Sequence, residues 1–165
     1  MPTDAVTDDL KKAMPHIAYE YRILNTAYRL ALNAKDTPSF VVAFDSFLLH
    51  YRTLIEFFYS TSDRAKRSDD LRAGDYVPGW RTPSFPMWEQ WNSRLHILLA
   101  HLSVKRIAVQ EQQTGFDHRR DFGPMLAEIA LAWNSFKGGG RWNGLRVLPG
   151  RRSDRLCFGF LAHVR

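Results

Sequence analysis

The chain has 165 residues, of which 45% are hydrophobic and 13% aromatic, enough to bury one core of ordinary domain size. Its single cysteine, Cys157, excludes an internal disulfide bridge, and no Cys or His spacing resembles a zinc site. The polar, acidic N-terminus and the shortness of every apolar run argue against a secretory signal and a membrane-spanning helix. We therefore expect a cytoplasmic protein that uses no membrane, metal or cofactor.

Four stretches place apolar residues at the three- and four-residue steps of an α-helix, over about residues 7–35, 38–60, 84–112 and 122–136. Between the first two, Thr37 is expected to cap the second helix. Pro38 fits its first turn because no backbone donor is needed there. The second helix is the most apolar, and we expect it to be the most buried. Its predicted core stripe is Val41, Phe44, Leu48, Tyr51, Ile55 and Phe58.

The other helices carry similar stripes, and a charged segment separates the second helix from the third. Residues 61–82 are predicted to form a long loop that Tyr76 and Trp80 hold against the helices. The third helix offers Trp88, Trp91, Leu95, Leu98, Leu102 and Val109 to the core. The fourth offers Phe122, Leu126, Ile129, Trp133 and Phe136.

The end of the chain changes pattern. Glycines at 138–140 stop the fourth helix, and residues 145–161 alternate apolar runs with a turn, as in a small β-hairpin. Four helices joined by short-to-moderate connections are typical of an antiparallel bundle. The sequence therefore predicts an all-α fold, with a four-helix bundle over residues 1–136 and a basic C-terminal tail or hairpin over 137–165.

The net charge of +6 is confined to that tail. Residues 1–136 hold 16 basic and 16 acidic residues, whereas residues 137–165 hold seven basic residues and one acidic residue. A basic segment on a neutral body indicates contact with RNA, DNA or an acidic protein surface, and a solvated, solubilising end gives the same pattern. The residues we assign to anion binding are Lys105, Arg106, Arg141, Arg151 and Arg152.

The densest chemistry lies on the third helix. Arg94 and His101 are seven residues apart, nearly two helical turns, so they share one line along the edge of the core stripe, which Lys105 extends. A histidine in this position can titrate near neutral pH, and an arginine can hold a phosphate. Metal-independent cleavage of RNA needs this pairing, with histidine transferring protons and arginine stabilising the scissile phosphate.

Structural roles compete with this assignment. A histidine on the flank of a bundle helix usually bonds a backbone carbonyl or a facing side chain, and this is the alternative for His101. His96 lies about 140° around the helix from His101, so the two cannot face one site. On the second helix, His50 could face the third helix and is a candidate partner for His101. Arg52 is expected to pair with Glu56 one turn later.

The Arg94-to-His101 element resembles the motif of HEPN (higher eukaryotes and prokaryotes nucleotide-binding) domains, in which four to six residues separate an arginine from a histidine. Residues 47–58 and 100–106 are also similar to a set of uncharacterised bacterial proteins. The resemblance spans roughly residues 15–135. It implies a homodimeric, metal-independent endoribonuclease of toxin or phage-defence type, with Arg94 and His101 as catalytic residues. Leu95 stands where such motifs commonly have a polar residue, so an inactive scaffold of the same type is equally consistent.

Two classes of function follow, beside a structural alternative. The first is an interaction or RNA-binding module without catalysis that uses the bundle and the tail. The second is the endoribonuclease. In the third reading the polar line of the third helix is a solvated edge, and the function lies in residues 61–82.

Overall fold

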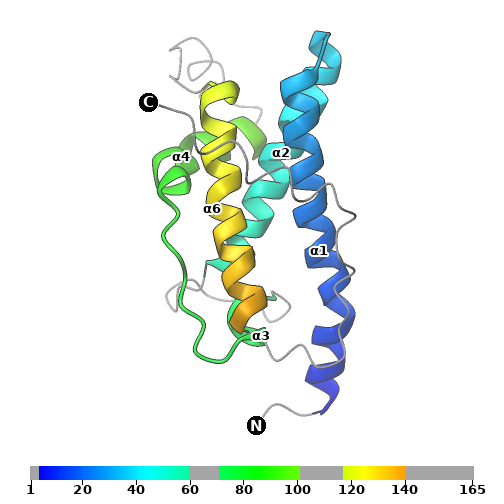
Figure 1. The fold of residues 1–165 in the computed structure, drawn as a ribbon, viewed down its shortest axis with the longest axis vertical. Coiled ribbons are helices and arrows are strands. Elements are labelled where there is room, and N and C mark those ends of the chain that lie inside the picture. The colour runs from blue at the N-terminus through cyan, green and yellow to red at the C-terminus, as the bar shows by residue number, and fades with distance from the viewer. Residues whose placement is uncertain (1–3, 60–70, 101–116, 140–165) are drawn as a thin grey trace.

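The computed structural model describes residues 4–59, 71–100 and 117–139, which are helical almost throughout (Figure 1). Helix α1 spans Asp4–Asn33, α2 Thr37–Phe58, α3 Ala73–Tyr76, α4 Pro86–Ala100 and α6 His118–Gly139. No strand occurs within these described ranges, so the all-α prediction is confirmed for them. The predicted hairpin and the rest of the tail from residue 140 lie outside the described residues.

The three long helices α1, α2 and α6 lie side by side along the long axis of the molecule (Figure 1). α1 and α2 form a hairpin through the short connection at residues 34–36, and α6 packs against both of them. α4 contacts α2 and α6, and Figure 1 shows it on the side of α6 away from α1. The helix that carries Arg94 therefore lies across the structure from α1.

Asp36, and not the predicted Thr37, caps the start of α2. The Asp36 backbone is extended, and its carboxylate accepts hydrogen bonds from the Ser39 backbone N–H at 2.8 Å and from the Ser39 hydroxyl at 3.0 Å. Aspartate is the more effective cap because its charge also interacts favourably with the helix dipole. The Ser39 hydrogen bonds lower the pKa of Asp36. Pro38 occupies the first turn, as predicted.

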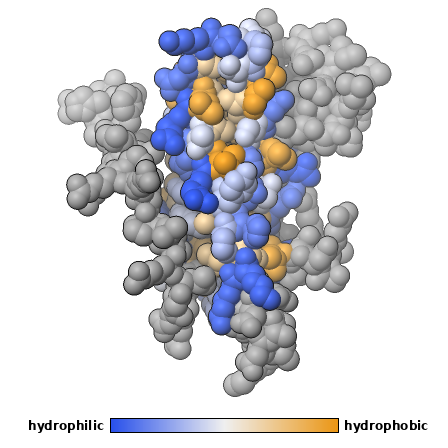
Figure 2. Space-filling model, turned by 90° about the vertical axis from the view of Figure 1, so that its right-hand side faces the viewer, coloured by the Kyte–Doolittle hydropathy of each residue, from blue (hydrophilic) through white to orange (hydrophobic). Residues whose placement is uncertain are grey.

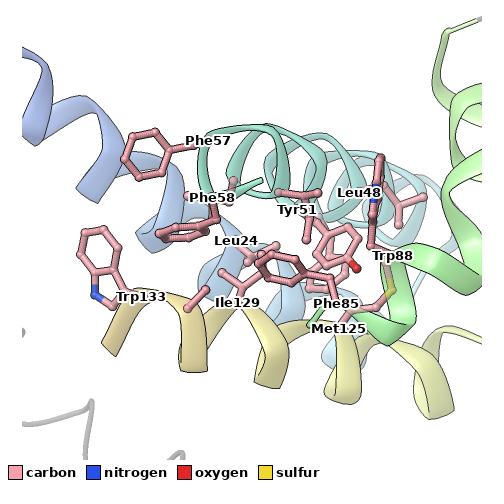
Figure 3. Packing of buried hydrophobic residues seen from close by; sticks show 14 of the residues in the cluster. Leu24, Leu48, Tyr51, Phe57, Phe58, Phe85, Trp88, Met125, Ile129 and Trp133 are labelled. Atoms are coloured by element: carbon pink, nitrogen blue, oxygen red, sulfur yellow. The ribbon is translucent and has the colours of Figure 1, made fainter. Parts of the chain in front are cut away.

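One hydrophobic core runs between the helices (Figure 3). α1 contributes Ile17, Leu24 and Ala31, which are buried at the seven-residue spacing that the periodicity predicted. α2 contacts α1, α3, α4 and α6, and for this reason it is buried along most of its length, as expected. Its buried residues are Ala43, Phe47, Leu48, Tyr51, Leu54, Ile55, Phe57 and Phe58.

The core stripe predicted for α2 is correct except at its first residue. Val41 is 46% exposed, and Phe44 is partly buried. The buried face of α2 is centred on Phe47 and Leu54, which turns Val41 to the edge of the stripe. The predicted stripe was therefore rotated slightly toward solvent at the start of the helix.

The stripes of α4 and α6 agree with the periodicity of the sequence. Trp88, Trp91 and Leu95 of α4 are buried, while the side chains of Leu98, Leu102 and Val109 lie outside the described part of the chain. Leu126 of α6 is partly buried at the edge of the core. The remaining predicted residues of α6, namely Phe122, Ile129, Trp133 and Phe136, are buried.

The segment predicted as an unstructured loop contains the one-turn helix α3. A local hydrogen bond stabilises its start, because the backbone N–H of Arg72 donates to Oδ2 of Asp75 at 2.8 Å. The expected anchors are both present. The indole Nε1 of Trp80 donates to the Phe58 carbonyl at 3.0 Å, and the Tyr76 ring meets Phe136 edge-on at a centroid distance of 5.7 Å. The second half of this segment is thus attached to the core.

Candidate functional site

Arg94 lies on the exposed side of α4, at the edge of the core stripe that the helical spacing predicted. Its guanidinium carbon is 5.2 Å from the centroid of the Trp91 ring. Trp91 and Leu95 are buried beside it, so the aromatic face that Arg94 covers is fixed by the core. Stacking on an indole restricts the orientation of a guanidinium, and a restricted guanidinium loses less entropy when it binds a phosphate.

The remaining predicted site residues are His101, Lys105, Arg106, Arg141, Arg151 and Arg152, and these lie outside the described residues. The side chain of His96, within α4, also lies outside the described part. The pairing of Arg94 with His101 and the anion-binding set therefore stay predictions.

A buried carboxylate attaches the start of α4 to the neighbouring helices. Glu128 of α6 is 6% exposed, and its Oε2 accepts a hydrogen bond from the backbone N–H of Met87 at 3.0 Å. Its Oε1 accepts a hydrogen bond from the hydroxyl of Tyr51 on α2. The first N–H groups of a helix have no partner within the helix, and a negative charge there also interacts favourably with the dipole. One side chain thus links α2, α4 and α6.

The surroundings of Glu128 favour its neutral form. Burial raises the pKa of Glu128, although the hydrogen bonds from Tyr51 and from the backbone of Met87 and Trp88 oppose the change. Burial also raises the pKa of the Tyr51 hydroxyl, and the neighbouring Glu128 adds to that effect. Both carboxylate oxygens of Glu128 receive donors from the protein, so the group is suited to positioning α4 and, through it, Arg94.

Sequence reasoning missed this pair. Glu128 stands between apolar residues of the α6 stripe, three positions after Met125 and one before Ile129, and its place in that stripe was the available signal. An acidic residue on the buried face of a helix requires a donor, and the start of a neighbouring helix supplies one.

His50 faces α1 in the structure, and its pairing with His101, which lies outside the described residues, stays a prediction. Its Nδ1 lies 2.5 Å from Oε2 of Glu20, and its ring meets Tyr19 nearly edge-on at a centroid distance of 6.3 Å. The helical spacing did not indicate which neighbouring helix His50 would face. The predicted pair of Arg52 and Glu56 is confirmed, with 2.8 Å between Nε and Oε1.

The start of α6 gathers a second group of charges, which are compensated locally. Arg120 donates to both carboxylate oxygens of Asp121, each at 2.8 Å. The same carboxylate accepts the backbone N–H of Asp117, and Asp117 in turn accepts the backbone N–H of Arg119. Burial alone would raise the pKa of Asp121, but the donors from Arg120 and Asp117 outweigh it and hold the pKa below its ordinary value. These contacts stabilise the start of α6, and they pair the charge of Arg120 with that of Asp121.

Within the described ranges, no group of three or more His, Cys, Asp or Glu side chains could hold a metal ion. None of the described helices combines the length and the apolar character needed to cross a membrane. No protein-family model, curated protein or solved structure matches the chain. The residues of the chain itself therefore have to support any functional assignment.

Proposed function

We propose that the chain is an RNA-binding module without catalytic activity, built on a HEPN-like antiparallel four-helix bundle. The long helices α1, α2, α4 and α6 would form the bundle, and the basic tail would hold the RNA backbone. The observation that supports this most is the distribution of charge. The body is balanced, whereas residues 137–165 hold seven basic residues against one acidic residue.

The physical basis is release of counterions. A polyanion binds a neutral surface weakly. Each lysine or arginine that neutralises a phosphate releases a condensed cation, and this release strengthens binding at low salt. Arg94, exposed on α4 and stacked on Trp91, would extend the anion-binding surface toward the bundle. An acidic protein surface would use the same cations, so the binding of RNA and of an acidic protein has to be compared directly.

Replacing Arg141, Arg151 and Arg152 together by glutamine is expected to weaken binding of single-stranded RNA by at least about tenfold at low salt. The slope of log K against log salt concentration should fall by about 2 units, from roughly 0.7 unit for each lost phosphate contact. Fluorescence anisotropy with a labelled oligonucleotide, titrated at several salt concentrations, measures both quantities on the full chain.

The matched control removes three charges elsewhere. Lys11 and Lys12 on α1 and Lys35 in the connection after it are exposed and outside the predicted anion-binding set, so their glutamine variant should keep the wild-type slope. Equal losses in the two variants would indicate nonspecific attraction to net charge. Absence of RNA binding by the wild-type chain, with binding to an acidic protein retained, would reject RNA as the partner.

A second candidate is a metal-independent endoribonuclease, and the exposure of Arg94 at the edge of the α4 stripe favours it. Arg94 would hold the scissile phosphate, and His101 would transfer the proton. If the chain cleaves RNA in the presence of a chelator, His101→Ala and Arg94→Ala should each lower the rate by about 100-fold or more, as loss of an acid/base group or a phosphate clamp does.

His96→Ala serves as the matched control for that assay. It removes a histidine that the predicted helical spacing places about 140° away from His101, and it should leave the rate unchanged. Equal loss in all three variants would point to a general loss of folding and not to a site. No cleavage by the wild-type chain would leave the binding module as the proposed function.

A further inference from the structure

The outer face of the α1–α2 hairpin exposes a strip of large apolar side chains. Tyr19 and Leu30 on α1 and Val42 and Leu49 on α2 are each between 48% and 71% exposed. Figure 2 shows the side of the molecule on which α1 lies, where hydrophobic side chains are set among hydrophilic ones. Four large apolar side chains gathered on one pair of helices form a patch, in contrast to the single exposed residues that are common on soluble proteins.

The four residues share a face because of helix geometry. Val42 and Leu49 are seven residues apart, nearly two turns, and Tyr19 and Leu30 are eleven apart, about three turns. The contacts of His50 with Glu20 and with Tyr19 fix how the two antiparallel helices are aligned. Residues on one side of this alignment therefore form a continuous strip along the hairpin, which is called the apolar strip below.

The two edges of the apolar strip carry opposite charges. Arg22 and Arg29 are exposed on α1, and Asp45 and Glu56 are exposed on α2. Glu56 is paired with Arg52. Within the described part of the chain, no ion pair involves Arg22, Arg29 or Asp45. The face is thus apolar along its centre, basic along α1 and acidic along α2.

We propose that this face binds a second copy of the chain, with the twofold axis parallel to the helices. Rotation about such an axis lays α1 of one copy over α2 of the other, so that each basic edge meets an acidic edge. Because Glu20 is level with His50, Asp45 is level with about residue 25 of α1. Asp45 of one copy would then lie between Arg22 and Arg29 of the other copy. A twofold axis across the helices would instead lay α1 on α1 and set these arginines against each other.

The size of the face predicts a dimer of modest strength. Two adjacent helices, each about 10 Å wide and about 30 Å long, offer about 600 Å² from each copy. The buried total of about 1,200 Å² is at the lower limit for stable interfaces, so dimerisation should depend on concentration. α4 lies across the structure from α1, so this dimer keeps the two Arg94 residues apart. It is thus distinct from a dimer whose Arg94 residues meet at the twofold axis.

Sedimentation velocity of the full chain, from micromolar to near-millimolar concentration and without RNA, tests the proposal. The wild-type chain should shift from monomer to dimer. Leu49→Asp places a charge in the interface from each copy and should raise the dissociation constant by at least about tenfold. Leu131→Asp is the matched control, because Leu131 is 68% exposed on α6 and lies outside the apolar strip. Its self-association should equal that of the wild type.

Charge reversal tests the orientation of the two copies. Asp45→Arg alone and the double variant Arg22→Glu/Arg29→Glu alone should each be monomeric, since like charges then meet on both sides of the axis. An equimolar mixture of the two variants should form heterodimers, because every pair across the interface is again of opposite charge. A mixture that stays monomeric would overturn the proposed orientation.

Two results would overturn the interface itself: a wild-type chain that stays monomeric up to near-millimolar concentration, or a dimer that Leu49→Asp leaves intact. Circular dichroism of each variant confirms that the helices are retained. The readout involves no nucleic acid, so failure here is separate from failure of the proposed RNA binding.

Discussion

Replacing Phe136 by alanine is expected to lower the free energy of unfolding by about 3–5 kcal/mol, the range for removing a buried aromatic ring. Phe136 is fully buried near the end of α6. Its ring lies 5.3 Å from Phe57 of α2 and 6.0 Å from Trp80, both edge-on, besides the contact with Tyr76. The substitution would thus remove contacts to α2 and to the α3 segment together.

Urea unfolding followed by circular dichroism measures this effect, and the loss corresponds to about 8–15 °C in melting temperature for a chain of this size. Phe40→Ala is the matched control. Phe40 is only partly buried, near the start of α2, where its ring contacts Phe44 and His118. Its replacement should cost about 1 kcal/mol or slightly more. Similar losses in both variants would contradict the central place of Phe136.

The burial of Phe136 could be predicted from the sequence because it depends on local periodicity. Phe136, Trp133 and Ile129 recur at three- and four-residue steps, and a helix with that pattern has one apolar face whatever it packs against. The same reasoning gave the helices. It also placed Arg94 at the edge of its stripe, since exposure follows from position on the helix.

Periodicity could not identify partners across the fold. Tyr51 and Glu128 are 77 positions apart, and nothing in either segment indicates that they meet. His50 shows the same limit, because its spacing does not indicate which helix it faces, and the packing of α1 against α2 selects Glu20 as its neighbour. Asp36 and Thr37 are adjacent and both are good capping residues, so the sequence does not show which of them caps α2. The backbone conformation at Asp36 decides it.

Replacing Glu128 by alanine is expected to lower the free energy of unfolding by about 2–4 kcal/mol, because it leaves three donors without that acceptor. These donors are the Tyr51 hydroxyl and the backbone N–H groups of Met87 and Trp88, and a buried donor left unsatisfied costs about 1–3 kcal/mol. Hydrogen exchange should show that the Met87 amide loses protection in this variant. Retained protection would mean that α4 is held by its apolar contacts alone.

Glu128→Gln separates shape from charge, and its effect should depend on pH. Burial raises the pKa of Glu128 above the ordinary value of 4.5, so the folded chain holds a proton that the unfolded chain has released. The free energy of unfolding therefore falls as pH rises from 4.5 through the pKa of Glu128 in the folded chain. Above that folded-state pKa the contribution of the bound proton to stability is lost completely.

The glutamine variant cannot titrate at this position, so the stability of wild type minus variant should decrease as pH rises from 4.5 through the folded-state pKa of Glu128. Subtracting the variant also cancels Asp36 and Asp121, whose lowered pKa values act in the opposite direction. Urea unfolding of both chains across this interval gives the difference directly. An increase with pH would show that the amides of α4 and the Tyr51 hydroxyl stabilise the ionised carboxylate by more than burial destabilises it. In that case the start of α4 would be held by charge, and acid would release the helix that carries Arg94.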